Sequence, residues 1–235
     1  MDKKENMERI KEYQKIIREI LSAFEGVSFP VIVESSTGYK VLSIDKERDR
    51  DLIEDLSTIA RMITEEYNKI PITRDTYKSV IKKEPNAFRS NEVGRILEYK
   101  IYNVYMKNIK DTSKFKVISE IQPLKQVGYP DLKVIEKGGR VSFIDIKATT
   151  RPKVGSPRDF YYSTKSKTLQ KIDSDGFHLL LGFIIKEIEP GKFITVGWKL
   201  VDLSKIKVSI KAEFNADNLE IYKPEAIIKE EWVEN

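Results

Sequence analysis

The second half of the chain contains five segments that alternate in polarity or run continuously apolar, as β-strands do. Two of them, residues 141–146 and 179–185, are apolar on both faces, which is typical of strands in the middle of a covered sheet. The other three are residues 115–121, 132–135 and 193–201. A chain with this many strand segments is expected to fold around one central sheet, with the remaining segments flanking it.

Three helices are predicted ahead of these strands. Residues 7–24, 48–68 and 90–108 carry apolar side chains at spacings of three and four, the pattern of an amphipathic helix. Between the first two, residues 28–44 alternate around a turn signal at 35–38 and predict a β-hairpin. The order predicts an α/β (α+β) fold: a mixed central sheet flanked by helices, with a helix-hairpin-helix-like addition at the amino terminus.

A polar, proline-containing stretch at residues 82–89 predicts a connection between two parts of the chain. We interpret residues 1–85 as an N-terminal helical and hairpin region, and residues 86–235 as the core domain. The length of 235 residues and the hydrophobic content of 40% suffice for one large domain with such an appendage.

Composition removes several kinds of chemistry. There is no cysteine and one histidine, which excludes disulfides, zinc fingers and thiol nucleophiles and argues against a histidine metal cage or a Ser-His-Asp triad. Catalysis would have to use carboxylates, lysine and hydroxyl groups. The net charge of +5 is compatible with a nucleic-acid partner. The amino terminus has no uninterrupted apolar run, so we expect no signal peptide, no membrane span and a cytoplasmic protein.

One strand segment carries an acidic and a basic side chain on the same side. Asp145 and Lys147 are two residues apart, so in a strand they share one face while Ile144 and Ile146 share the other. A carboxylate and an ammonium in a buried strand are costly to desolvate unless they pair or hold a metal. A second carboxylate, Asp131, precedes another strand segment, and two carboxylates brought together bind a divalent cation such as Mg²⁺.

Whether Asp131 reaches Asp145 depends on the length of the glycine-rich turn between them. A two-residue turn at 138–139 would put Asp131 opposite Ile146 and the two aspartates on opposite faces of the sheet. A three-residue turn at 137–139 would put Asp131 opposite Asp145. Only the second register, or an equivalent bulge, builds a site.

Two motifs in this region resemble those of known nucleases. Residues 129–131 read YPD and residues 144–149 read IDIKAT, in the order of the YPD and IDIKTT segments of the EcoRV type. With the hairpin between them and the helix before them, they resemble the PD-(D/E)xK superfamily, specifically type II restriction endonucleases of the EcoRV and HincII type. Glu98 fits the acidic residue that these enzymes carry on the preceding helix, and residues 175–185 resemble the strand after their active site. The resemblance covers residues 90–185.

The resemblance implies a restriction-endonuclease-like fold and a type II restriction endonuclease. Such an enzyme is a homodimer that uses Mg²⁺ to hydrolyse both strands of a short palindromic site in double-stranded DNA, leaving 5′-phosphate and 3′-hydroxyl ends. It implies Asp131, Asp145 and Glu98 as metal-binding catalytic residues and Lys147 as the residue that positions or activates water. Residues 1–85 are expected to contribute to the dimer contact. Two alternatives stay open: a structure-selective repair nuclease or Holliday-junction resolvase of the same fold, and a non-catalytic DNA-binding module.

Candidate DNA contacts lie outside the two motifs. The segment 151–171 mixes cationic with aromatic side chains and is expected to contact phosphates, whereas polar side chains near 126 and in 211–218 are expected to read bases. His178 lies in an apolar run and is expected to be a packed or hydrogen-bonded sheet residue. The predicted DNA-binding residues are Gln126, Arg151, Lys153, Arg158, Tyr161, Lys165, Lys167, Lys211, Asn215 and Asn218.

Overall fold

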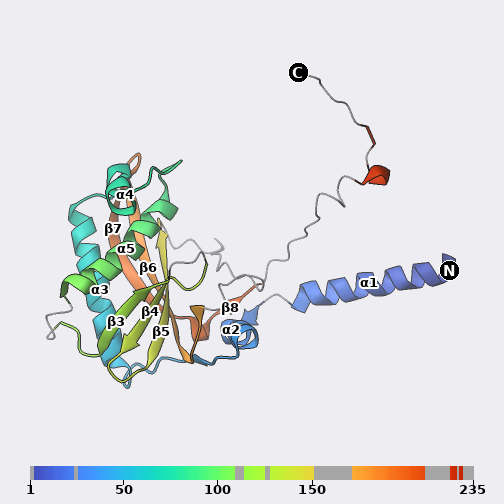
Figure 1. Ribbon diagram of the computed structural model, residues 1–235, viewed down its shortest axis with the longest axis horizontal. Coiled ribbons are helices and arrows are strands. Elements are labelled where there is room, and N and C mark those ends of the chain that lie inside the picture. Colours follow the sequence, from blue (N-terminus) through green and yellow to red (C-terminus); the bar gives the residue numbers. More distant parts are fainter. Residues whose placement is uncertain are drawn as a thin grey trace. The chain divides into compact units, whose positions relative to one another are not determined.

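In the computed structural model the chain forms two compact units (Figure 1). The larger unit is Ser28–Lys207, and the smaller one combines Met1–Val27 with Val208–Asn235. The structure describes residues 3–23, 26–108, 114–124, 128–150, 171–209, 223–226 and 228–229. Within these residues, no helix combines the length and the apolar character that crossing a membrane requires.

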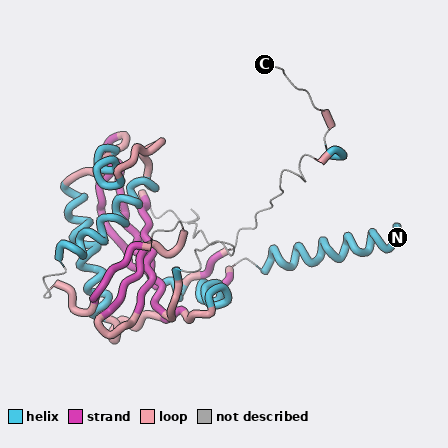
Figure 2. The backbone as a smooth tube through the Cα atoms, in the orientation of Figure 1, coloured by secondary structure: helices cyan, strands magenta, loops and turns pink. Residues whose placement is uncertain are grey.

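The larger unit is built on a six-stranded mixed sheet (Figure 2). Its strands are β2 (Val41–Leu42), β3 (Ile118–Pro123), β4 (Leu132–Glu136), β5 (Val141–Thr149), β6 (Gly176–Glu189) and β7 (Lys192–Asp202). They follow the spatial order β2-β6-β5-β4-β3, with β7 also paired to β6. The β2–β6 and β5–β6 pairs are parallel and the other pairs are antiparallel. The predicted mixed central sheet is confirmed, and each of the five predicted segments overlaps one of its strands.

Three helices flank this sheet: the first packs against β7, the third packs against β5, β3 and the first helix, and the second packs against the third. They are α3 (Arg50–Lys69), α4 (Arg74–Ile81) and α5 (Ser90–Asn108). Buried side chains of these helices and of the strands form one hydrophobic core. Ile144 and Ile146 of β5 belong to that core, so the helices cover the face of β5 opposite to Asp145. The helices predicted at 48–68 and 90–108 are confirmed.

A carboxylate from α3 holds the chain where it enters β3. Asp55 is buried, and its Oδ1 accepts a hydrogen bond from the backbone N–H of Lys116 at 2.9 Å. Its Oδ2 accepts two more, from the N–H groups of Val117 at 2.9 Å and Ile118 at 3.0 Å. Three bonds to a charged acceptor satisfy the buried group and fix α3 to the edge of the sheet.

The predicted hairpin at residues 28–44 is wrong. Its first half is helix α2 (Phe29–Thr37), which has a proline in its first turn and ends at Gly38 in the left-handed conformation, with φ of 79°. Proline suits the first helical turn and glycine suits the residue after the last one. The helix buries Phe29 and Val33, which are four residues apart. The apolar spacing that fitted a strand therefore also fits one face of a short helix.

The remaining elements are short or belong to the smaller unit. Helix α4 has no counterpart among the predicted elements; a capping box of two threonines, Thr73 and Thr76, starts it, with bonds of 3.1 and 3.3 Å. Helix α1 (Lys3–Ala23) confirms the helix predicted at 7–24. The other elements are β1 (Val27–Ser28), paired with β8 (Lys207–Val208), and 3-10 turns at Leu203–Lys205 and Pro224–Ala226.

Candidate active site

The pairing of β4 with β5 decides which of the two registers the chain adopts. Leu132 pairs with Ile144, and the same register continues to the far end of the two strands. Glu136 and Arg140 close the hairpin through a backbone hydrogen bond of 2.9 Å, which leaves a three-residue turn. Continued back by one position, this register places Asp131 opposite Asp145. The three-residue register is therefore the one that the chain forms.

Backbone hydrogen bonds orient the Asp131 side chain at the entrance to β4. Its N–H donates to the carbonyl of Ile144 at 3.0 Å. Its Oδ2 accepts from the N–H of Ile146 at 2.7 Å. Because both partners belong to β5, the carboxylate is fixed relative to the strand that carries Asp145 and Lys147. The Tyr129–Pro130 peptide just before it is cis.

Asp145 and Lys147 form an ion pair on the face of β5 that the helices do not cover. The Lys147 Nζ lies 2.8 Å from Oδ2 of Asp145. Asp145 is 1% exposed, whereas the Lys147 side chain is 29% exposed. The carboxylate is thus withdrawn from water while the lysine retains access to it. Two charged residues at the spacing i, i+2 lie on one side of the strand, as predicted.

The two aspartates repel each other's negative charge. Burial, and then the Asp131 carboxylate, raise the pKa of Asp145 to about 6, although Lys147 acts in the opposite direction. Burial also raises the pKa of Asp131, against the effects of the Ile146 N–H, Lys147 and Lys171. Neighbouring carboxylates with raised pKa values are typical of sites that take up a cation.

Glu98 approaches the aspartates from the helix-covered side. It lines a cavity of about 370 Å³ together with Leu132, whose side chain points to the opposite face of β4 from its neighbour Asp131. Burial raises the pKa of Glu98 to about 7, with further contributions from Asp131 and Asp145. The structure therefore brings Glu98 within electrostatic range of both aspartates. The remaining residues that line the cavity are Ile81, Arg95, Tyr99, Tyr102 and Pro123.

Lys171 is a member of the site that the sequence did not reveal. It ends the segment expected to contact DNA phosphates, but it is only 7% exposed. Its Nζ donates to the carbonyls of Gly128 at 2.6 Å and Pro130 at 2.8 Å, directly beside Asp131. The prediction of a phosphate contact is wrong for Lys171, because its ammonium faces the interior. No feature of the basic segment itself distinguishes this lysine from its neighbours.

His178 is packed inside the sheet unit, as predicted. It is fully buried, and its Nδ1 lies 2.6 Å from the hydroxyl of Tyr129. Phe143 and Phe29 contact the same ring at centroid distances of 5.0 and 5.9 Å. Burial lowers the pKa of His178 to about 4, so the ring is neutral at physiological pH. The ring supports Tyr129, two residues before Asp131.

The predicted DNA-binding residues lie outside the described residues. This applies to all ten: Gln126, Arg151, Lys153, Arg158, Tyr161, Lys165, Lys167, Lys211, Asn215 and Asn218. Their assignments stay predictions.

The donor set of the site suits a hard divalent cation. Mg²⁺ binds oxygen ligands, keeps several waters and needs only one or two carboxylates from the protein. Asp131 and Asp145 supply two facing carboxylates. In the part of the chain that the structure describes, no group of three or more His, Cys, Asp or Glu side chains is gathered closely enough to enclose a metal. The two aspartates therefore fit a partly hydrated cation rather than an all-protein cage.

A mixed central sheet flanked by helices is consistent with the restriction-endonuclease-like class of fold. Comparison with known proteins agrees. The type II restriction enzyme MjaV family matches residues 22–225. The type II restriction enzyme MjaV of Methanocaldococcus jannaschii is 35% identical over 241 residues, covering 98% of each chain. No solved structure matches the chain.

The chain belongs to the MjaV family of type II restriction enzymes. It is therefore a site-specific deoxyribonuclease, and DNA is its partner. This membership selects the restriction reading over the two alternatives, a structure-selective nuclease and a non-catalytic binding module.

Proposed function

We propose that this enzyme uses Mg²⁺ to hydrolyse both strands of a short palindromic DNA site at a centre formed by Asp131, Asp145 and Lys147. The observation that carries the proposal is the register of β4 and β5, which sets Asp131 opposite Asp145 with the Lys147 ammonium 2.8 Å from the second carboxylate. Asp131 and Asp145 would hold the cation. When bound, the cation supplies Lewis-acid polarisation of the scissile phosphate.

The side chains of the site have separate tasks in the hydrolysis. A water molecule attacks phosphorus in line with the 3′ oxygen and gives up a proton to the surrounding water. The bond from phosphorus to the 3′ oxygen breaks, and that oxygen takes a proton from water, which leaves a 5′-phosphate and a 3′-hydroxyl. Lys147 positions the water and stabilises the negative charge that develops on the phosphate oxygens. The ion pair with Asp145 keeps the Lys147 ammonium directed toward the attacking water and the phosphate. Glu98, with a pKa of about 7, assists through proton exchange near neutral pH.

Cleavage of both strands of a palindrome calls for two copies of this site. One active site cannot address two antiparallel strands symmetrically without turning around, so a two-fold dimer is the expected assembly. Helix α1 offers a surface for it, since it exposes an apolar stripe at the three-four spacing of a helix face. The stripe consists of Ile10, Tyr13, Ile16 and Ile17, which are 43–51% exposed. A second copy of the helix would cover this stripe.

The proposal is tested by incubating the purified protein with plasmid DNA and Mg²⁺, with Asp145→Asn beside it. The wild-type protein should produce discrete fragments, and chelation of Mg²⁺ should stop cleavage. Asp145→Asn should stay folded and produce no fragments. A matched control is Asp173→Asn, which removes an exposed carboxylate that pairs with Lys133 instead. Cleavage by Asp145→Asn at the wild-type rate would disprove the assignment.

A further inference from the structure

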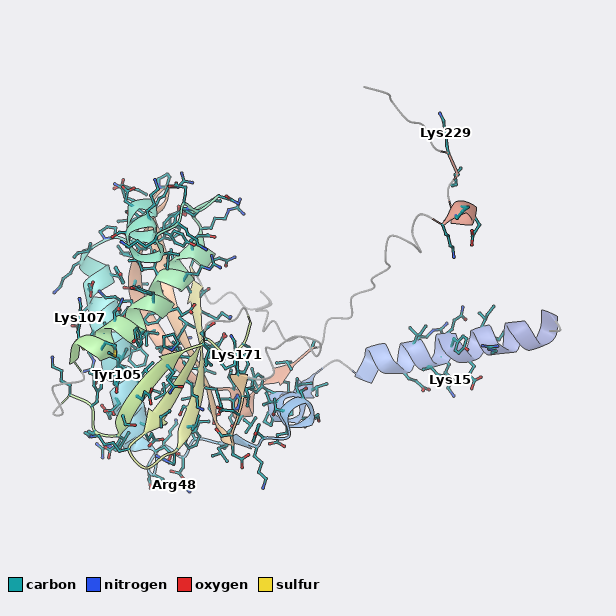
Figure 3. All side chains as sticks on the ribbon, viewed as in Figure 1. Lys15, Arg48, Tyr105, Lys107, Lys171 and Lys229 are labelled. Atoms are coloured by element: carbon teal, nitrogen blue, oxygen red, sulfur yellow. The ribbon has the colours of Figure 1, made fainter. Side chains whose placement is uncertain are left out.

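Lys171 is a buried cation that the proposed chemistry does not use. Its side chain is labelled in Figure 3, on the sheet unit. Its ammonium donates hydrogen bonds to the carbonyls of Gly128 and Pro130, at 2.6 and 2.8 Å. Gly128 and Pro130 are 43 and 41 residues from Lys171 in the sequence. The lysine therefore joins the chain that enters β6 to residues 128–131, which we call the Asp131 segment.

Two neutral carbonyls do not offset the desolvation of a buried ammonium. The compensating charge comes from the three carboxylates around it: Asp131, then Glu98 and Asp145, each favour its charged form. The interaction is reciprocal, because Lys171 lowers the pKa of all three acids. The same ammonium thus reduces the repulsion among these three carboxylates. It also holds the backbone just before Asp131.

We propose that Lys171 is a positioning residue of the active site, which fixes the Asp131 segment against β5 and keeps the carboxylate cluster assembled for the cation. This inference rests on the proposed function, since it concerns the same site. Because Lys171 is 7% exposed, we assign it no contact with the substrate. It acts through Asp131, whose placement relative to Asp145 depends on the backbone at Gly128 and Pro130.

A positioning lysine and a lysine that only stabilises the fold differ in what their loss changes. A lysine that only stabilises the fold would change the melting temperature and leave the folded enzyme with wild-type kinetics. A positioning lysine changes the chemistry of the folded enzyme, because a displaced Asp131 holds the cation less well. Loss of such a supporting contact typically costs about 10- to 100-fold in metal affinity or activity.

The test measures the Mg²⁺ affinity of the DNA-free protein by calorimetric titration and, beside it, single-turnover cleavage of plasmid DNA as a function of Mg²⁺ concentration, below the melting temperature of each variant. Lys171→Met, which keeps the length but loses charge and donors, should cut about 10- to 100-fold more slowly and need more Mg²⁺ for half-maximal rate. Lys171→Arg, which keeps charge and donors, should recover most of the rate. Lys133→Met is the control, because Lys133 lies on β4, close in sequence to Asp131, but pairs with exposed Asp173 at 2.7 Å; it should cut like the wild type.

A folded Lys171→Met enzyme with wild-type rate and wild-type Mg²⁺ dependence overturns the inference. If Lys171→Met does not fold, Lys171→Gln decides in the same assay: slower cleavage supports the inference, and a wild-type rate overturns it. Asp145→Asn, measured in parallel, keeps the two proposals apart. An inactive Asp145→Asn with wild-type Lys171 variants disproves only the role of Lys171, whereas an active Asp145→Asn disproves the proposed site itself.

Discussion

The Oδ2 atom of Asp131 accepts a hydrogen bond of 2.7 Å from the backbone N–H of Ile146. Ile146 lies between Asp145 and Lys147, so one carboxylate of the site is oriented by the backbone of the strand that carries the other two groups. The geometry of the site therefore depends on a strand pairing rather than on flexible side chains alone. Preorganisation of this kind lowers the cost of gathering charged groups around a ligand.

Asp145→Asn should stabilise the metal-free protein above pH 6. Burial and Asp131 raise the pKa of Asp145 from 3.8 to about 6, so the folded state binds this proton more tightly than the unfolded state. Stability is therefore unaffected below the unfolded pKa and decreases as the pH rises from there through the folded pKa. Because the substitution removes this penalty but leaves Lys147 without its partner, we expect a net gain of about 1 kcal/mol.

Thermal unfolding with a metal chelator present, at about pH 4 and at about pH 8, measures this effect. The variant should gain in melting temperature over the wild type at the higher pH only. An equal gain at both values would show that the charge of Asp145 is not the cause.

Mg²⁺ binding should strengthen as the pH rises from below 6 to above 7. The carboxylates must lose their protons to bind a cation, and the pKa values are about 6 for Asp145 and about 7 for Glu98. Calorimetric titration of the DNA-free enzyme across this range measures the affinity at each pH. Glu98→Gln should remove the part of the pH dependence of Mg²⁺ affinity that lies near pH 7. An unchanged dependence would show that Glu98 does not contribute to cation binding.

Lys147→Met should leave metal binding intact and slow cleavage. The substitution removes the ammonium that lies 2.8 Å from Asp145 without adding bulk. We expect a loss of about 10²- to 10⁴-fold in single-turnover rate, the range for a lost proton-transfer or charge-stabilising group. Mg²⁺ titration of the same variant is the control, since weakened binding would show that Lys147 supports the carboxylates instead.

Ile17→Glu should dissociate the dimer that we propose. Ile17 is 50% exposed on α1, within its apolar stripe. A charge in the middle of a covered apolar contact should weaken association by about 100-fold, or roughly 3 kcal/mol. Sedimentation equilibrium measures the mass of both proteins. Lys11→Glu, on the charged side of α1, should remain dimeric, and a monomeric wild-type protein would contradict the assignment of α1.

Arg158→Gln and Lys165→Gln should weaken binding to every duplex alike. Contacts to phosphates carry no sequence information, so each lost contact should reduce the slope of log affinity against log salt by about one. Asn215→Ala and Asn218→Ala should instead alter the choice of sequence, at about 1 to 3 kcal/mol per lost base contact. Competition between cleavable and scrambled duplexes at two salt concentrations distinguishes the two. The opposite pattern would place base recognition on residues 151–171.

The sequence predicts those helices and strands whose apolar residues repeat with the spacing of only one kind of element. Helices α3 and α5 have an apolar stripe long enough to exclude a strand, and β5 and β6 are apolar on both faces. Helix α2 was misread because Phe29 and Val33 satisfy the period of a strand as well as that of a helix, and the segment is too short to separate the two.

The candidate site was predictable as far as it lies on one hairpin. Asp131, Asp145 and Lys147 are related by strand geometry once the turn length is chosen. The role of Lys171 was not predictable, because its partners are backbone carbonyls more than 40 residues away. Every residue has such a carbonyl, so the sequence does not indicate which of them accepts a hydrogen bond. The position of Glu98 relative to the sheet depends on how α5 packs on β5 and β3, which the helical pattern alone does not specify.

The length of the turn at residues 137–139 sets the register that places Asp131 opposite Asp145. The turn lies six residues from Asp131 along β4, about 20 Å away, and touches none of the groups of the site. A slip of the β4–β5 pairing by one residue, into the two-residue turn at 138–139, would turn every β4 side chain to the other face and separate the two aspartates. Gly139 helps to hold the three-residue turn, because its φ of 81° lies in the left-handed region that favours glycine. A change in this turn that slips the pairing by one residue should therefore inactivate the enzyme as completely as the loss of a metal ligand.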